Sequence, residues 1–237
     1  MVRALMMTGG APSHDFKSTA PVLAKVLNDA GIVTETEWDF DAAARKLDAG
    51  GYDLLVVHAL RWRMHGEKYE ADRPAYQYTP PEAVKSAIAN HVARGGGLFA
   101  LHTAMICFDD WPEWLNILGG GWVWGQSFHP PYGTVQAAIT DVAHPITAGL
   151  PKTFTINDEV YSKLAFTPDA TPLMMLQAPD GSAPQSGAWA RQVGKGRVAF
   201  ECLGHDIESI EHPVHKRLLL RCALWAAGRP DSELQEV

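Results

Sequence analysis

Short apolar segments alternate along the first hundred residues with segments of helical pattern. Four apolar segments predict buried β-strands and cover Arg3–Thr8, Val33–Trp38, Asp53–Ala59 and Gly97–Leu101. Three helical segments lie between them and cover Ser18–Ala30, Asp41–Ala49 and Thr79–Arg94. The last of these begins with Thr79-Pro80-Pro81-Glu82, a capping-box pattern. Strand–helix alternation favours a parallel sheet with helices on both faces.

The pattern changes in the second half of the chain, where the apolar segments become shorter. They predict strands at Thr134–Ile139, Phe154–Ile156, Leu173–Gln177, Ala188–Val193 and Arg197–Cys202. The sequence GKGR at 194–197 is typical of a hairpin turn, so part of the sheet should be antiparallel. A final helix is expected over Glu211–Ala227. We therefore expect one α/β domain over residues 1–237, with a mainly parallel sheet and some antiparallel strands toward the carboxyl end.

Two long loops interrupt this pattern, Leu60–Tyr78 and Gly119–Pro131. Long loops in a compact domain are more often functional than idle. Both contain aromatic and polar residues, among them Trp124 and His129, and such a mixture suits a sugar because rings stack on its C–H faces. Packing of the same rings against another subunit, or within the surface of one chain, is the alternative. We expect Gly119–Pro131 to cover a binding crevice and Leu60–Tyr78 to contribute to a homodimer.

Composition excludes several classes of protein. The net charge is −7 without a basic stripe or a lysine-rich amphipathic segment, which argues against nucleic acid and membrane surfaces as partners. The first ten residues are broken too soon by glycine for a signal peptide, and no apolar segment reaches membrane-spanning length. The three cysteines are widely spaced without a CxxC motif, as in a cytoplasmic protein with reduced thiols; they are Cys107, Cys202 and Cys222.

Histidine is unusually frequent, with ten residues, and four of them follow predicted strands. These are His14, His58, His102 and His205. Because the carboxyl ends of parallel strands meet at one edge of a sheet, where such folds bind ligands, we expect a shared site there. The alternative for each residue is a structural role in a turn, and for His58 a position in the core.

Further candidates lie in the loops near this edge. The sequence NDEVY provides Asp158, Glu159 and Tyr161. Neighbouring residues on a strand point to opposite faces, so we select Glu159 to face the crevice, with Asp158 as second choice. Asp15 and Asp206, beside His14 and His205, complete the candidates for substrate binding, which are Asp15, His58, Trp124, His129, Asp158, Tyr161 and Asp206. We expect His91 to be solvated and His144 to be structural, and the pair His212 and His215 is weak evidence for a metal.

Three kinds of activity are compatible with these residues. The first is acid–base chemistry on a sugar or keto-sugar, with His14, His102, His205 and Glu159 as catalytic residues. The second is hydrolysis assisted by a divalent metal such as Zn²⁺, for which His14, His102 and His205 are candidate ligands. The third is sugar binding without catalysis.

Several motifs in one order give the chain a family resemblance. GGAPSHDF, GGGLFALHTA, HPITAGLP, NDEVY and GKGRVAFECLGHD follow one another between about Arg3 and Ala227. Together they resemble the ThuA-like trehalose-utilisation family. The resemblance implies a flavodoxin-like fold of the class I glutamine amidotransferase type. It also implies a role in disaccharide or keto-sugar metabolism beside sugar oxidoreductases.

The turn after the fourth strand departs from the amidotransferase pattern. Amidotransferases carry a cysteine nucleophile there, whereas this chain has His102-Thr103-Ala104. Cys107 lies too far along to occupy the turn. Thr103 is an alternative nucleophile, although His102 is too close in sequence to act easily as its base. We therefore expect a site that has kept its position and changed its chemistry.

Overall fold

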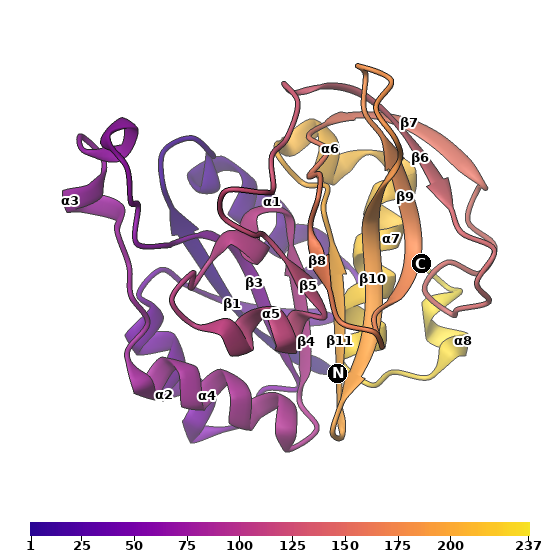
Figure 1. The fold of residues 1–237 in the computed structure, drawn as a ribbon. Coiled ribbons are helices and arrows are strands. Elements are labelled where there is room, and N and C mark those ends of the chain that lie inside the picture. Colours follow the sequence, from indigo (N-terminus) through magenta and orange to yellow (C-terminus); the bar gives the residue numbers. More distant parts are fainter.

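A nine-stranded mixed β-sheet forms the centre of the molecule in the computed structural model, which describes residues 1–237 (Figure 1). The strand order is β2-β1-β3-β4-β11-β10-β9-β6-β7. The parallel half contains β1 (Val2–Gly10), β2 (Ile32–Glu37), β3 (Leu54–Leu60), β4 (Gly97–Leu101) and β11 (Gly196–Glu201). The antiparallel half adds β10 (Gln185–Val193), β9 (Thr171–Gln177), β6 (Gly133–Ile139) and β7 (Thr153–Asp158). A separate pair joins β5 (Gly120–Gly121) to β8 (Ala165–Phe166).

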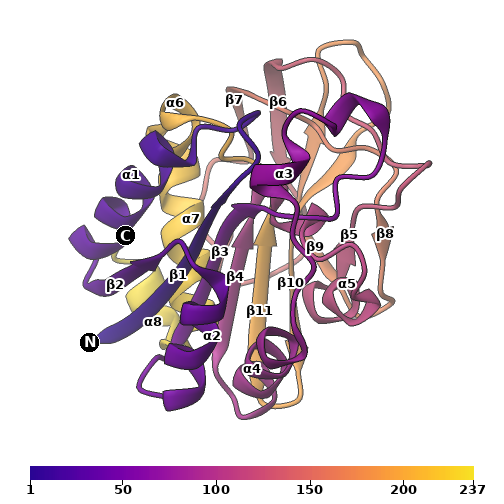
Figure 2. The ribbon, with the colours of Figure 1, turned by 90° about the vertical axis from the view of Figure 1, so that its left-hand side faces the viewer.

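Helices cover both faces of the sheet, as Figure 2 shows. One layer contains α1 (Phe16–Asp29), α6 (Ile207–Glu211), α7 (Pro213–Ala226) and α8 (Asp231–Leu234). The opposite layer contains α2 (Phe40–Ala49), α4 (Glu82–Ala93) and α5 (Pro112–Leu118). Every residue of β3 and β4 is buried, because strands covered on both faces expose no side chain to water. None of the helices combines the length and apolar character that a membrane crossing requires.

The predicted parallel sheet with antiparallel strands toward the carboxyl end is confirmed. The antiparallel part is larger than expected, since four strand pairs are parallel and four are antiparallel. The loop Leu60–Tyr78 contains two short helical turns, Glu67–Tyr69 and α3 (Arg73–Tyr76). The expected capping box is wrong, because Pro81 is the N-cap of α4 and no side chain caps this helix.

His91 is also placed differently from the sequence-based expectation. It is buried at the end of α4, where its Nε2 lies 3.0 Å from the carbonyl oxygen of Gly97. Gly96 makes room for the ring, since a Cβ at this glycine would lie 2.3 Å from His91 Cε1. His91 is therefore a core residue at the amino end of β4, on the edge of the sheet opposite to the four strand-end histidines.

His58 lies within β3 and is 1% exposed. The Thr19 hydroxyl donates to the carbonyl oxygen of Asp15, so it accepts a hydrogen bond from His58 Nε2, at 2.9 Å. The ring packs edge-on against Phe16. α1 thus covers His58. The structure therefore favours the alternative that His58 is a core histidine over its predicted contact with substrate.

The buried imidazole of His58 makes stability depend on pH. Burial, aided by the charge of His14, lowers the pKa of His58 from 6.5 to about 3. Between these values the unfolded chain binds more protons than the folded one, so stability falls as the pH falls. Each pH unit costs about 1.4 kcal/mol, and about 2–3 kcal/mol should be lost between pH 7 and pH 4.5.

Denaturant unfolding at the two pH values measures this loss, with His58→Gln as the control because glutamine does not titrate. The variant should be less stable at pH 7 and lose less stability than the wild type on acidification. Equal losses in the two proteins would contradict the assignment.

Candidate functional site

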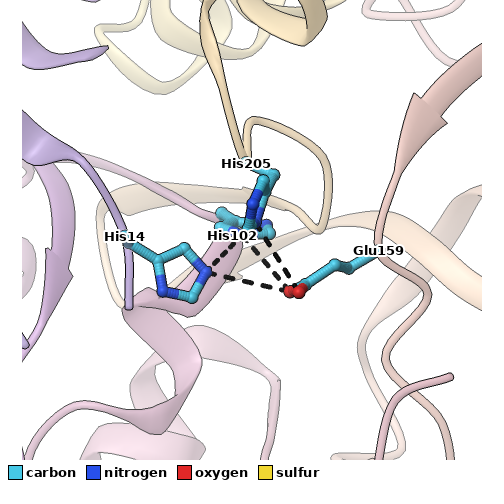
Figure 3. A group of neighbouring side chains, drawn as sticks. All are labelled: His14, His102, Glu159 and His205. Carbon is cyan, nitrogen blue, oxygen red and sulfur yellow. Dashed lines mark hydrogen bonds and ion pairs between the residues drawn. The ribbon is translucent and has the colours of Figure 1, made fainter. Parts of the chain in front are cut away.

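Four titratable side chains meet at the carboxyl edge of the parallel strands (Figure 3). His14 follows β1, His102 follows β4, His205 follows β11, and Glu159 follows β7. Each offers one nitrogen or oxygen atom, and these atoms lie within 4.8 Å of one another. The structure thus brings together the four residues that the sequence proposes as catalytic, and we call them the His/Glu cluster.

His102 occupies the sharp turn after β4. Its backbone has φ +55°, a left-handed conformation that costs a residue with a side chain about 1–2 kcal/mol. Such strain is typical of functional positions, and the nucleophile of α/β-hydrolases stands at a strained strand-to-helix turn. Here the strained turn carries an imidazole.

A backbone carbonyl fixes which nitrogen of His102 carries the proton. Leu101 pairs with Glu201 in the parallel register, so the next residues, His102 and Cys202, are also neighbours. His102 Nδ1 lies 2.7 Å from the carbonyl oxygen of Cys202, and a carbonyl can only accept. Nδ1 therefore donates, and Nε2 presents its lone pair to the cluster. Burial lowers the pKa of His102 well below its usual range, and the charge of His14 acts in the same direction.

The other two histidines face the same point. His14 Nε2 lies 3.0 Å from His102 Nε2, and Ser13 Oγ lies 3.2 Å from His14 Nδ1. His205 Nδ1 is a buried atom without a hydrogen-bond partner and lies 3.7 Å from Glu159 Oε1. A buried nitrogen aimed at a carboxylate and at two imidazoles is poised for a ligand between them.

Glu159 supplies the negative charge of the cluster. Its Oε2 lies 3.8 Å from His14 Nε2 and 3.7 Å from His102 Nε2, and it accepts a hydrogen bond from the Tyr161 hydroxyl at 3.0 Å. Burial alone would raise the pKa of Glu159, but His14 and His205 outweigh it and hold this pKa far below the usual range. Glu159 in turn raises the pKa of His205. Burial, together with Glu159, raises the pKa of Tyr161, which keeps its proton.

The donor set fits a transition-metal ion. Three imidazoles and a carboxylate are ligands that Zn²⁺ and similar divalent ions prefer. A histidine ligand commonly donates its other N–H to a carbonyl group, as His102 does to Cys202. The unpartnered Nδ1 of His205 is a further available donor atom.

A cavity of about 450 Å³ opens beside the cluster. His14, Glu159 and Tyr161 form part of its wall, and His129 joins them, with Nδ1 3.7 Å from Glu159 Oε1. The remaining wall is largely aromatic and comes from both long loops, with Trp62 and Tyr69 from one and Trp122, Trp124 and Phe128 from the other. Both loops therefore border one cavity. The sequence analysis assigned only Gly119–Pro131 to the crevice and assigned Leu60–Tyr78 to a homodimer interface.

Three carboxylates that the sequence proposes for substrate binding make structural contacts. Asp158 is fully buried and accepts hydrogen bonds from the backbone N–H groups of Glu159 and Gly204, so it cannot reach a substrate in the cavity. Asp15 is the N-cap of α1, although it also borders a smaller pocket beside His14. Asp206 is the N-cap of α6 and accepts a hydrogen bond from Tyr132.

A second buried polar group was not anticipated from the sequence. His215 is buried in α7 against Glu201, whereas His212 is the N-cap of the same helix, so they do not form a metal-binding pair. The signal for this group is Glu201, a charged residue within the predicted apolar strand Arg197–Cys202. All three cysteines are buried, and Cys107 Sγ and the Thr103 hydroxyl both donate to the carbonyl oxygen of Ala59. Burial raises the pKa of Cys107 to about 12.

Comparison with solved structures gives the same fold. A ThuA-like protein from Parabacteroides merdae has 20% sequence identity and a TM-score of 0.77, over 96% of this chain and 91% of that one. A ThuA-like protein from Bacteroides uniformis has 18% identity and a TM-score of 0.71, over 99% and 95%. A carbohydrate deacetylase has 14% identity and a TM-score of 0.60, over 96% of this chain and 32% of that one.

Among curated proteins, none matches this sequence. A family model does, and it covers residues 3–226. The motifs that suggested the resemblance, the mixed sheet and the strand-end histidines all lie within this match. The chain therefore belongs to the ThuA family, described as trehalose utilisation.

Proposed function

We propose that this protein is an enzyme that binds a divalent metal ion, such as Zn²⁺, at the His/Glu cluster and acts on a disaccharide or keto-sugar in the adjoining cavity. The observation that carries the proposal is the neutral His102, whose Nε2 lone pair points at three other donor groups. A bound divalent ion would act as a Lewis acid on a substrate oxygen. Cysteine has no part in this chemistry, because all three thiols are buried.

The wall of the cavity supports a sugar as substrate. Trp62 and Trp124 stack with ring centroids 6.3 Å apart, and Trp122 meets Trp124 edge-on. Such rings match the C–H faces of a pyranose, while His14, His129 and Glu159 offer partners for its hydroxyl groups. The family description, trehalose utilisation, is consistent with a disaccharide or a sugar derived from one.

In this proposal, His129 and Tyr161 are the residues that transfer protons. His129 Nδ1 donates to the carbonyl oxygen of Pro130 at 3.0 Å, which leaves Nε2 as a base. Tyr161 keeps its proton and donates to Glu159, so it can hold that carboxylate in place or pass a proton inward. Abstraction of a proton beside a ketone needs a base and a group that stabilises the resulting negative charge, and His129 and the cluster supply these roles.

Metal-assisted hydrolysis is the second candidate. The same donor set can activate water, and a carbohydrate deacetylase shares the fold. We retain sugar binding without turnover as the non-catalytic alternative. We also propose a cytoplasmic location, a homodimer and a sugar oxidoreductase that supplies the keto-sugar.

Metal analysis tests the cluster directly. Protein incubated with Zn²⁺ and passed through a desalting column should retain about one ion per chain, measured by mass spectrometry of the metal. His102→Ala should lose the ion and the activity while it keeps its circular dichroism spectrum. His65→Ala, which removes an exposed histidine outside the cluster, should retain both. Wild-type protein without a retained ion would contradict the metal site.

Product analysis by NMR separates the candidate reactions. Trehalose, maltose and their 3-keto forms are incubated with the protein in deuterated water. Proton abstraction should exchange a C–H beside the ketone for deuterium, and His129→Gln should slow this exchange about 10²–10⁴-fold. Release of monosaccharide without exchange would favour hydrolysis, and binding without any product would favour the non-catalytic alternative.

Trp124→Ala tests the aromatic wall. Trp124 is 44% exposed, and its loss should weaken sugar binding about tenfold, or ~1.4 kcal/mol, without a change in sedimentation. Phe166→Ala is the control, since Phe166 is equally exposed and lies outside the cavity. Unchanged sugar binding with a halved mass would assign Trp124 to a subunit interface instead.

A further inference from the structure

A group of buried polar side chains lies directly behind the His/Glu cluster. It consists of Asp158, Glu201, Ser209 and His215, each 0% exposed. The four residues come from the ends of β7 and β11 and from α6 and α7. Buried charges are costly unless they are paired and hydrogen-bonded, so such a group requires a physical explanation.

The group forms one connected network. His215 Nε2 lies 3.0 Å from both carboxylate oxygens of Glu201, and His215 Nδ1 lies 2.6 Å from the carbonyl oxygen of Ser209. Both ring nitrogens therefore face acceptors. Burial alone would lower the pKa of His215, but Glu201 outweighs it and raises this pKa. The Ser209 hydroxyl then donates to Asp158 Oδ2, which connects the ion pair to the second carboxylate.

On the side of the cluster, the network holds the backbone of Glu159 and of the segment that leads to His205. Asp158 accepts from the N–H of Glu159 at 2.7 Å, from that of Gly204 at 2.8 Å and from that of His205 at 3.4 Å. Glu201 Oε2 accepts from the N–H of Leu203. The segment 202–205, which carries His205 and the carbonyl group that orients His102, is thus held by two buried carboxylates.

The network also places a carboxyl group directly behind a cluster histidine. Asp158 accepts hydrogen bonds from the N–H groups of Glu159 and Gly204 and from the Ser209 hydroxyl. These donors hold the carboxyl group with its Oδ1 3.9 Å from His102 Nδ1. The network therefore reaches His102 as well as His205 and Glu159.

We propose that Asp158, Ser209 and the Glu201–His215 pair are positioning residues that hold His102, His205 and Glu159 in register for a divalent cation. The metal in this inference rests on the proposed function; the positioning of the imidazoles does not. Partners behind metal-binding histidines typically contribute 10–100-fold to metal affinity.

The test compares His215→Gln with His91→Gln in the full chain. Both variants remove a buried imidazole, but His91 lies at the opposite edge of the sheet. Titration with Co²⁺, followed by its visible absorption, should show affinity about 10–100-fold lower in His215→Gln and unchanged in His91→Gln. Folded His215→Gln with wild-type affinity and an unchanged cobalt spectrum would overturn the proposal.

A second measurement needs no metal. Long-range ¹H–¹⁵N spectra of the metal-free protein report the protonation state of each imidazole. The imidazole ¹⁵N signals of His102 and His205 should shift in His215→Gln. Shifts confined to residues that contact position 215 would overturn the positioning.

Ser209→Ala, a smaller change that removes only the hydroxyl group, replaces His215→Gln if that variant does not fold. Wild-type protein that fails to bind Co²⁺ would refute the metal in the proposed function, while the spectra would still decide the positioning.

Discussion

The hydrogen bond from His102 Nδ1 to the carbonyl oxygen of Cys202 is the interaction on which the site depends. It joins the ends of β4 and β11, the parallel pair that borders the antiparallel half of the sheet. It compensates for a strained backbone, because the left-handed turn at His102 brings the ring to this carbonyl. It also decides the chemistry of the cluster, since a neutral imidazole with its lone pair inward can bind a cation or accept a proton.

The remaining parts of the site supply what His102 lacks. Glu159 provides the negative charge. A hydrogen bond from the Tyr161 hydroxyl holds its carboxylate beside the cavity that both residues line. The aromatic wall gives one side of the cavity an apolar surface beside the polar cluster. A family described by its role in trehalose utilisation is thus represented here by a candidate site of three imidazoles and a carboxylate.

Sequence reasoning could find the elements and the edge, because strands buried on both faces are continuous apolar segments and end where polar residues begin. His14, His102 and His205 follow from that rule. The rule could not distinguish His58 from these three residues. His58 also lies near the carboxyl end of a parallel strand, but α1 covers it. Strand alternation places Glu159, rather than Asp158, toward the cavity. Only the structure reveals that Asp158 contacts the backbone of the loop that carries His205. The Glu201–His215 pair depends on how α7 crosses β11, which no local pattern encodes.

The four cluster residues are far apart along the chain, from His14 to His205, and Glu159 belongs to the antiparallel half of the sheet. Contacts between distant residues form late, because the entropy of closing long loops must be overcome before they contribute. During synthesis, a ribosome-bound chain has no complete cluster until residues beyond 205 have emerged. A fragment that ends shortly after β4 would have the strained turn without its Cys202 acceptor. The centre is therefore a late product of folding, and a chain that stops early cannot capture an ion with the full set of ligands.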